Sequence, residues 1–212
     1  MTIHILAVII LSGLSSFFAA FLCIRTFMLF LKKLDFRVLG RALALLDMFA
    51  GFTCILFGEM FKMYPLYSVG ILFLACFSIG LCWVNVLENS NPYSGKKTLL
   101  YIIIFTPFLV LLTFAFPFAS LAPLMDTVLT RNFAIWNVIG SGALFFMWFG
   151  SVLISRLRDV EIYLATSAFI FFGASVFLIY DHIGSMVTAA TFLYLIGITT
   201  FSYTWVTHEK GY

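Results

Sequence analysis

The sequence predicts an all-α membrane protein, a bundle of seven transmembrane helices with its N-terminus outside and its C-terminus in the cytoplasm. Three observations predict this class. The 212 residues are 63% hydrophobic and 10% charged, with a mean hydropathy of +1.12, whereas soluble domains carry about 25% charged residues. Seven apolar segments are long enough to cross a bilayer, and the basic residues between them fall almost entirely on one side.

The seven segments make one transmembrane domain, residues 1–212. A span needs about 20 apolar residues to cross about 30 Å of hydrocarbon. The predicted spans cover residues 4–31, 38–61, 66–87, 98–118, 133–155, 161–180 and 183–206. Their Phe-rich runs are apolar on every face, which favours helices over the alternating strands of outer-membrane barrels, each about ten residues long.

Each span has its own distinguishing features. The first is predicted to be a retained helix, because MTIH has no basic n-region and the apolar run continues to Leu31. The second contains Asp47, and the third ends near Asn85. The fourth contains Pro107, which predicts a kink. The fifth carries Gly140 among small residues that suit close packing. The sixth span ends at Asp181 and His182, and the seventh has a polar face that includes Thr191 and Thr199.

Lysine and arginine residues orient the bundle. If there are seven spans, nine of these residues lie on one side: Lys32, Lys33, Arg37, Arg41, Lys96, Lys97, Arg156, Arg158 and Lys210. Only Lys62 and Arg131 lie on the other side, where residues 119–132 form the longest connection, and Arg25 lies inside the first span. Basic residues mark cytoplasmic loops, so the N-terminus is outside. The pattern predicts an integral protein of a plasma membrane, of the bacterial inner-membrane type.

Asp47 is the acid that the apolar pattern least explains. At about 1.5 Å per residue it lies roughly 13 Å inside the second span. A charge at that depth costs at least about 2.5–3.5 kcal/mol, so its carboxyl should face the bundle interior, be protonated or be paired. Gly51, Cys54 and Gly58 share its helix face, which predicts close approach of another helix.

Two interpretations of Asp47 stay open. In one, Asp47 is a coupling or ion-binding acid in a polar cavity. The other residues of that cavity are Arg25, Asn85, Thr191, Thr199 and Tyr203. In the other, an Arg25–Asp47 pair locks the first two spans together. Hydroxyls of the seventh span, which also holds Tyr194, either line the cavity or bond carbonyls of their own helix. Asn137 in the fifth span is expected to contact either a solute or a neighbouring helix.

Four polar residues share the outer ends of the helices. They are His4, Glu59, Asp181 and His182. Such a set suits a divalent metal or a pH sensor if its members converge, and an intramembrane enzyme would require that convergence. The sequence favours the plainer interpretation, that these residues lie in headgroups and water, so no metal site is predicted.

A shift of 122 residues aligns parts of the two ends of the chain. Gly51 aligns with Gly173, Glu59 with Asp181, and Trp83-Val84 with Trp205-Val206. Parallel repeats of this kind occur in transporters and here predict a 3+1+3 arrangement. That plan is similar to that of the sugar-facilitator and vitamin-precursor transporters, whose motifs are absent, so the likeness concerns the fold alone.

Several classes of ligand are not expected. No lysine lies within the seventh span to bind retinal, and the histidines all lie at helix ends rather than in intramembrane pairs that would hold haem. The sequence therefore predicts no cofactor. The basic residues are explained by topology, which leaves no basis for nucleic-acid binding. The four cysteines lie in apolar runs without a CxxC pair, as buried apolar side chains do.

The function predicted is that of a small transporter or channel-like protein with Asp47 in a polar cavity. The alternative is a non-catalytic membrane subunit, or a seven-helix sensor or anchor module, that acts through a separate partner protein. An enzyme is the least favoured class. The expected partners are the lipid bilayer and either another protein or a second copy of the chain.

Overall fold

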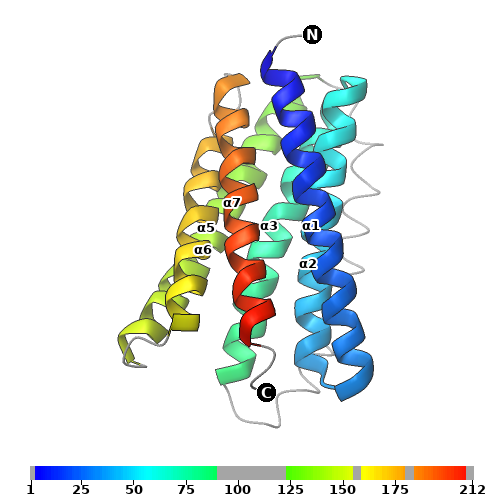
Figure 1. Cartoon of the computed structure of the whole chain (residues 1–212). Helices are drawn as coiled ribbons and strands as arrows, with labels where there is room; N and C mark the ends of the chain where they lie inside the picture. The colour runs from blue at the N-terminus through cyan, green and yellow to red at the C-terminus, as the bar shows by residue number, and fades with distance from the viewer. Residues whose placement is uncertain (1–2, 90–122, 155–158, 180–183, 209–212) are drawn as a thin grey trace.

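The computed structural model describes residues 3–89, 123–154, 159–179 and 184–208, which form an all-helical bundle (Figure 1). Six α-helices and no strand occur in these ranges: α1 (Ile3–Lys33), α2 (Phe36–Phe61), α3 (Tyr64–Asn89), α5 (Pro123–Ile154), α6 (Asp159–Ile179) and α7 (Gly184–His208). They correspond to six of the predicted spans. The fourth predicted span, residues 98–118, lies outside the described residues, as do Asp181 and His182.

All six helices are long and apolar enough to cross a membrane, as in a polytopic integral membrane protein. On α1 one face is apolar and exposed along its length. Residues at spacings of three and four, namely Ile10, Leu14, Phe17, Phe21 and Ile24, are 45–68% exposed. Burying such a face in hydrocarbon is favourable, whereas in water it would be an unusually large apolar patch. The bilayer is therefore the natural environment of this surface.

The start of α5 differs from the prediction. The sequence placed a connection at 119–132, but residues 123–132 belong to the helix. The apolar window of α5 begins only at Asn132, and hydropathy therefore missed the preceding turns. A helix needs no apolar residues to form, and Pro123 suits its first turn because proline's missing N–H has no partner there.

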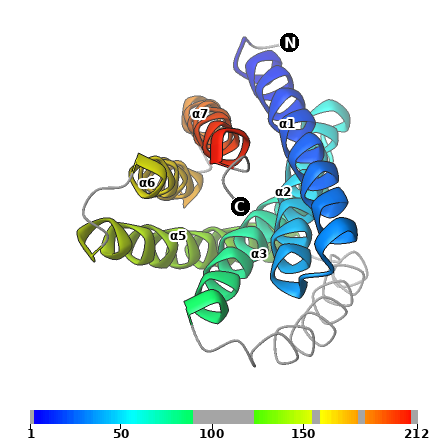
Figure 2. The same cartoon turned by 60° about the horizontal axis from the view of Figure 1, so that its bottom comes forward.

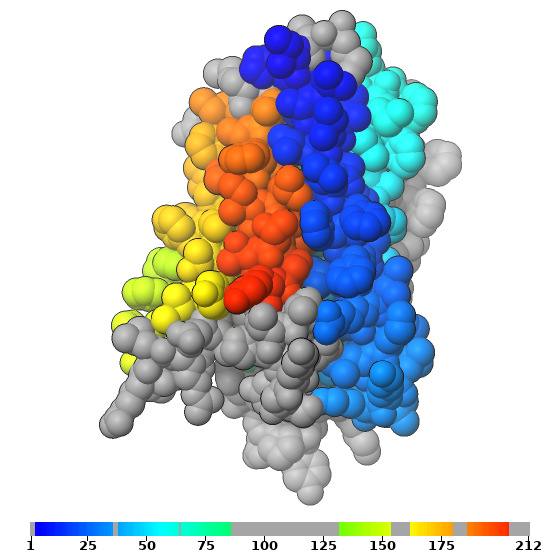
Figure 3. Space-filling view, in the orientation of Figure 1, coloured from blue at the N-terminus to red at the C-terminus, as the bar shows by residue number. Residues whose placement is uncertain are grey.

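The helices form a closed ring in the order α1, α2, α3, α5, α6, α7, with α7 returning to α1 (Figure 2). Most neighbours are antiparallel. The exceptions are α1 with α7 and α3 with α5, because all four run from one end of the bundle to the other in the same direction (Figure 1). Two contacts show this for α3 and α5: Ser78 bonds Asn137, and Cys82 bonds the Gly140 carbonyl. Figure 3 shows α1 and α7 side by side on one face.

Tight connections close the first two hairpins. Leu34 and Lys62 each adopt a left-handed backbone conformation, with φ of 51° and 55°. After Lys62, the Met63 N–H donates to the Gly58 carbonyl over 2.9 Å, which satisfies a carbonyl at the end of α2. These two-residue turns hold α1, α2 and α3 as consecutive antiparallel neighbours.

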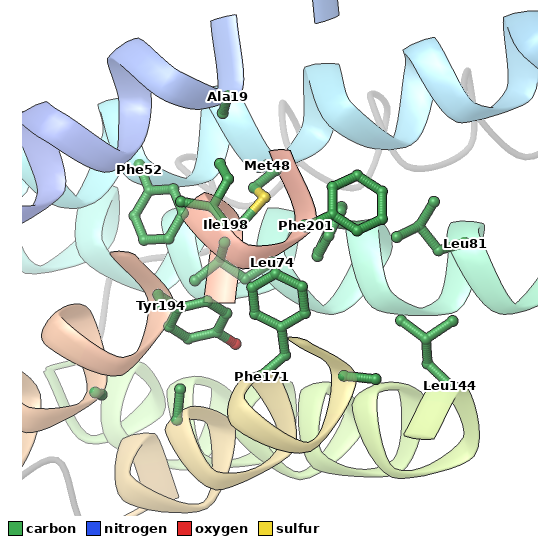
Figure 4. Close-up of a cluster of buried hydrophobic side chains, with 14 of the residues drawn as sticks. Ala19, Met48, Phe52, Leu74, Leu81, Leu144, Phe171, Tyr194, Ile198 and Phe201 are labelled. Carbon is green, nitrogen blue, oxygen red and sulfur yellow. The ribbon is translucent and has the colours of Figure 1, made fainter. Parts of the chain in front are cut away.

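Aromatic side chains fill the centre of the ring. Phe52 from α2, Phe77 from α3, Phe171 from α6 and Tyr194 from α7 are at most 1% exposed. Phe52 meets the Tyr194 ring edge-on at 5.4 Å between centroids, and Phe77 meets Phe171 at 5.5 Å. Figure 4 shows Phe52, Tyr194 and Phe171 among aliphatic neighbours such as Leu74. The core therefore lies on the ring axis, where four helices from both ends of the chain meet.

Candidate functional site

A buried hydrogen-bonded network crosses the centre of the bundle. Asn137 on α5 is fully buried, and its Nδ2 donates to the Tyr194 hydroxyl on α7 over 2.6 Å. Its Oδ1 accepts a hydrogen bond from Ser78 Oγ on α3 over 3.1 Å. Each residue lies near the middle of its helix. One amide thus joins three helices near the middle of the bundle, and we call Ser78, Asn137 and Tyr194 the central network.

Hydroxyls on α5, α6 and α7 adjoin this network. Ser141, one turn after Asn137, donates to the Asn137 carbonyl over 2.6 Å and lies 2.8 Å from Ser175 Oγ on α6. Thr191, nearly one turn before Tyr194, is buried and donates to the Val187 carbonyl over 3.0 Å. The buried polar groups in the described residues are serine and threonine hydroxyls, the Asn137 amide and tyrosine hydroxyls such as that of Tyr194. The site is therefore polar but carries no formal charge.

The network has a spare donor. The Tyr194 hydroxyl accepts the Asn137 hydrogen bond, and none of the described residues accepts its own proton. Phe52 and Phe171 flank the Tyr194 ring at 5.4 and 5.8 Å. Buried donors usually have partners, so this hydroxyl is a candidate for bonding a solute or water when the aromatic rings separate.

Local sequence explains how the rings fit. A Cβ added to Gly197 on α7 would lie 2.5 Å from Cε1 of Phe171. Only glycine therefore lets Phe171 reach beneath α7 to the ring axis. Likewise, a Cβ at Gly140 on α5 would lie 2.9 Å from Ile79 Cγ1. Because Gly140 has no side chain, α5 can lie close to α3. This closeness lets the Asn137 amide form a hydrogen bond with Ser78.

Asp47 lies away from the ring axis. Phe52 and Met48 face the core, and at about 100° per residue Asp47 lies roughly 140° from Phe52 around α2. Its neighbours one turn away, Leu43 and Ala50, are half-buried like Asp47 itself. Gly51, one turn later, packs against Gly70 and Leu74 of α3. Asp47 thus lies at the edge of α2 next to α3, away from the ring axis.

The surroundings of Asp47 come from α1 and α3. The carboxyl lies within electrostatic range of the Cys23 thiol on α1 and the Cys76 thiol on α3. The described residues give it no hydrogen bond or ion pair. Cys23 faces α2, because its Sγ bonds the Ala42 carbonyl. Arg25 lies about 200° around α1 from Cys23, which turns it away from α2 and therefore from Asp47.

The remaining residues of the predicted cavity are dispersed. Asn85 is half-buried near the end of α3. Thr199 and Tyr203 lie on the exposed face of α7, where Tyr203 is 56% exposed. The Thr199 hydroxyl bonds the Ile196 carbonyl of its own helix over 2.8 Å. The structure thus brings Thr191 next to the central network but does not bring Thr199 and Tyr203 there.

The outer-rim set is only partly described. His4 is exposed at the start of α1, and Glu59 is half-buried near the end of α2. Because α1 and α2 are antiparallel neighbours, these two residues share one end of the bundle. Within the described ranges no group of three His, Cys, Asp or Glu side chains could hold a metal ion.

Sequence reasoning noticed Asn137 and Tyr194 separately but did not join them. They are 57 residues apart and on helices that are not neighbours in the ring. The available signal was an amide inside an apolar span, which is costly unless it is bonded. Comparison with family models, curated proteins and solved structures gives no match to this chain.

Proposed function

We propose that this protein is a small solute transporter of the plasma membrane, with its N-terminus outside, and that the central network is its binding site. The proposed architecture is a single seven-span domain in a 3+1+3 arrangement. The parallel contact of α3 with α5 supports it. A chain that leaves one end of α3 and begins α5 at the opposite end must cross back, and residues 98–118 are apolar enough to do so as a span.

The observation that carries the proposal is an uncharged polar network near the middle of the bundle, where the two halves of the ring meet. Ser78 belongs to the first half, α1–α3, and Asn137 and Tyr194 belong to the second half, α5–α7. Transporters built from repeats place their sites near the bilayer midplane at the interface between the repeats. The network joins the two halves near the middle of α3, α5 and α7, which supports such a site.

The chemistry of the site favours an uncharged solute with hydroxyl or amide groups. Tyr194 offers a proton, and the Asn137 amide and the Ser78 hydroxyl can exchange their mutual bonds for bonds to the solute. In the conformation described, Phe52 and Phe171 close the ring around Tyr194. Access from either side would require the two halves to rock apart, which separates these rings.

Asp47 is the proposed coupling acid. It lies five residues before Phe52, about 7.5 Å further along α2 towards the cytoplasmic end, and it has no ion pair among the described residues. Intramembrane acids of this kind commonly relay protons in transporters. We expect Asp47→Asn to abolish uptake driven by a pH gradient while the protein stays folded in the membrane. Normal uptake by this variant would remove that role.

A membrane subunit or sensor acting through a partner protein is the second candidate. The filled centre of the ring favours it, because Phe52, Phe77 and Phe171 leave a solute no open passage. In this function the central network would only lock α3, α5 and α7 together. A stoichiometric partner recovered after mild detergent extraction would support this candidate.

The test is solute entry into proteoliposomes. Swelling is followed by light scattering with glycerol and xylitol outside, for the wild type, Asn137→Leu and the control Thr166→Val. Thr166 is exposed and bonds only its own helix. We expect faster entry than in protein-free vesicles. Asn137→Leu should reduce it about tenfold, since that change removes an amide that would bond the solute, and Thr166→Val should leave it unchanged. Entry no faster than in protein-free vesicles would contradict transport of neutral solutes.

A further inference from the structure

We propose that a groove between α1 and α2 binds an anionic phospholipid of the leaflet on the basic side of the membrane. The groove has a volume of about 300 Å³, at the lower end of the range of about 300–1,000 Å³ for ligand pockets. Its lining is entirely apolar or thiol: Cys23, Ile24, Phe27 and Met28 from α1, and Ala42, Leu43 and Leu46 from α2. The site does not involve the central network, and the inference is independent of transport.

The groove exists because small and large side chains alternate along this seam. At its base, Cys23 Sγ donates to the Ala42 carbonyl over 3.4 Å, which holds the two backbones close. At its rim, Phe27, Met28 and Leu46 are 45%, 54% and 45% exposed. The groove therefore opens sideways from the bundle, into the hydrocarbon. A polar solute would find no partner there, whereas an acyl chain would bury apolar surface against every wall.

The depth of the groove matches one leaflet. Cys23 lies ten residues before Lys33, the last residue of α1, which is about 15 Å along the helix. That distance is half of the hydrocarbon thickness of about 30 Å. A lipid whose chain lies against Cys23 and Met28 would place its headgroup at the end of α1.

The lysines at the end of α1 favour an anionic headgroup. Lys32 is one turn beyond Met28 on nearly the same face of α1, and both Lys32 and Lys33 are exposed. Arg41 near the start of α2 is half-buried, and Asp35 between the helices is the only acid in residues 32–41. Basic clusters at the cytoplasmic ends of transmembrane helices attract anionic lipid headgroups. The combination of apolar groove and adjacent lysines therefore fits a phospholipid with a negative headgroup better than a neutral one.

Native mass spectrometry of the delipidated full chain tests the proposal. The probes are phosphatidylglycerol and phosphatidylcholine with identical palmitoyl and oleoyl chains. We expect phosphatidylglycerol to bind roughly tenfold more tightly, because two lysines meet its headgroup. The double variant Lys32→Gln/Lys33→Gln should remove that preference while leaving phosphatidylcholine binding unchanged. The control Lys62→Gln, at the opposite end of α2, should keep the preference.

A second variant tests the groove itself. Leu46→Trp places a larger side chain at the rim from an exposed position, so it should weaken both lipids without unfolding the protein. Leu153→Trp, at a 70% exposed site on α5, is the matched control. Equal binding of the two lipids by the wild type, or unchanged binding by Leu46→Trp, would overturn the proposal. So would a dimer that Leu46→Trp dissociates, because the groove would then be a contact between copies.

Discussion

The two halves of the ring, α1–α3 and α5–α7, share a contact pattern but differ in how they pack. In each half the first helix meets the second through paired hydroxyls: Ser16 with Thr53 at 2.8 Å, and Ser141 with Ser175 at 2.8 Å. Thr53 and Ser175 are separated by 122 residues, the offset that also aligns Gly51 with Gly173. The seams between halves correspond as well, since α3 meets α5 and α7 meets α1.

Packing within the halves is different. In the first half, glycines bring α2 and α3 into backbone contact. A Cβ at Gly51 would lie 3.0 Å from the Gly70 carbonyl oxygen, and one at Gly58 would lie 2.9 Å from the Tyr67 nitrogen. In the second half, Gly173 has open space around it, and Phe171 and Tyr194 fill the contact between α6 and α7. The comparison teaches that the same arrangement of helices is reached here by close backbone contact in one half and by aromatic packing in the other.

Removing an aromatic ring from the second half should have the largest effect. Phe171→Ala deletes a fully buried side chain that contacts Phe77 and Tyr194, so we expect a loss of about 3–5 kcal/mol in the free energy of unfolding. The matched control is Phe169→Ala, because Phe169 is 57% exposed on the same helix. Unfolding by sodium dodecyl sulfate in mixed micelles, followed by tryptophan fluorescence, gives both values. Similar losses for the two variants would mean that the aromatic centre does not stabilise this half.

Adding a methyl group to the first half should have the next largest effect. In Gly70→Ala the new Cβ would lie 2.8 Å from the Gly51 carbonyl oxygen and 2.7 Å from Ile55 Cγ1, so α2 and α3 must move apart. We expect a loss of about 1–3 kcal/mol. Gly173→Ala, with open space at its Cβ, should be neutral or stabilising by up to about 1 kcal/mol. The same denaturation assay compares them, and equal effects would contradict the difference between the halves.

The sequence predicted seven spans, and six of them are helices in the described residues, because apolar run length is a local property that sets where a span can lie. It also predicted close packing next to Asp47, and the contacts of Gly51 and Gly58 with α3 confirm this. It misplaced the start of α5, because polar residues around Asp126 lowered the hydropathy without preventing a helix.

The site was harder to predict because it depends on which helix faces are apposed. Thr199 and Asn137 are both polar residues in apolar spans, yet Thr199 bonds its own helix while Asn137 bonds α3 and α7. A threonine hydroxyl can reach the carbonyl three or four residues earlier, whereas the Asn137 side chain bonds two other helices. Likewise, the position of Asp47 along its helix can be read from the sequence. Which neighbouring helices its side of α2 faces depends on tertiary contacts.

The paired hydroxyls give the smallest expected effect and the most direct test of correspondence between the halves. Double-mutant cycles with Ser16→Ala and Thr53→Val, and with Ser141→Ala and Ser175→Ala, measure the coupling across each seam. Interhelical hydrogen bonds in membranes average about 0.6 kcal/mol, and we expect both couplings to be favourable and near that value. Ser141 also bonds the Asn137 carbonyl, which cancels in the cycle because that bond does not involve Ser175. A favourable coupling in one half and none in the other would mean that the shared 2.8 Å geometry has no common energetic role, and the case for two equivalent halves would then rest on helix order alone.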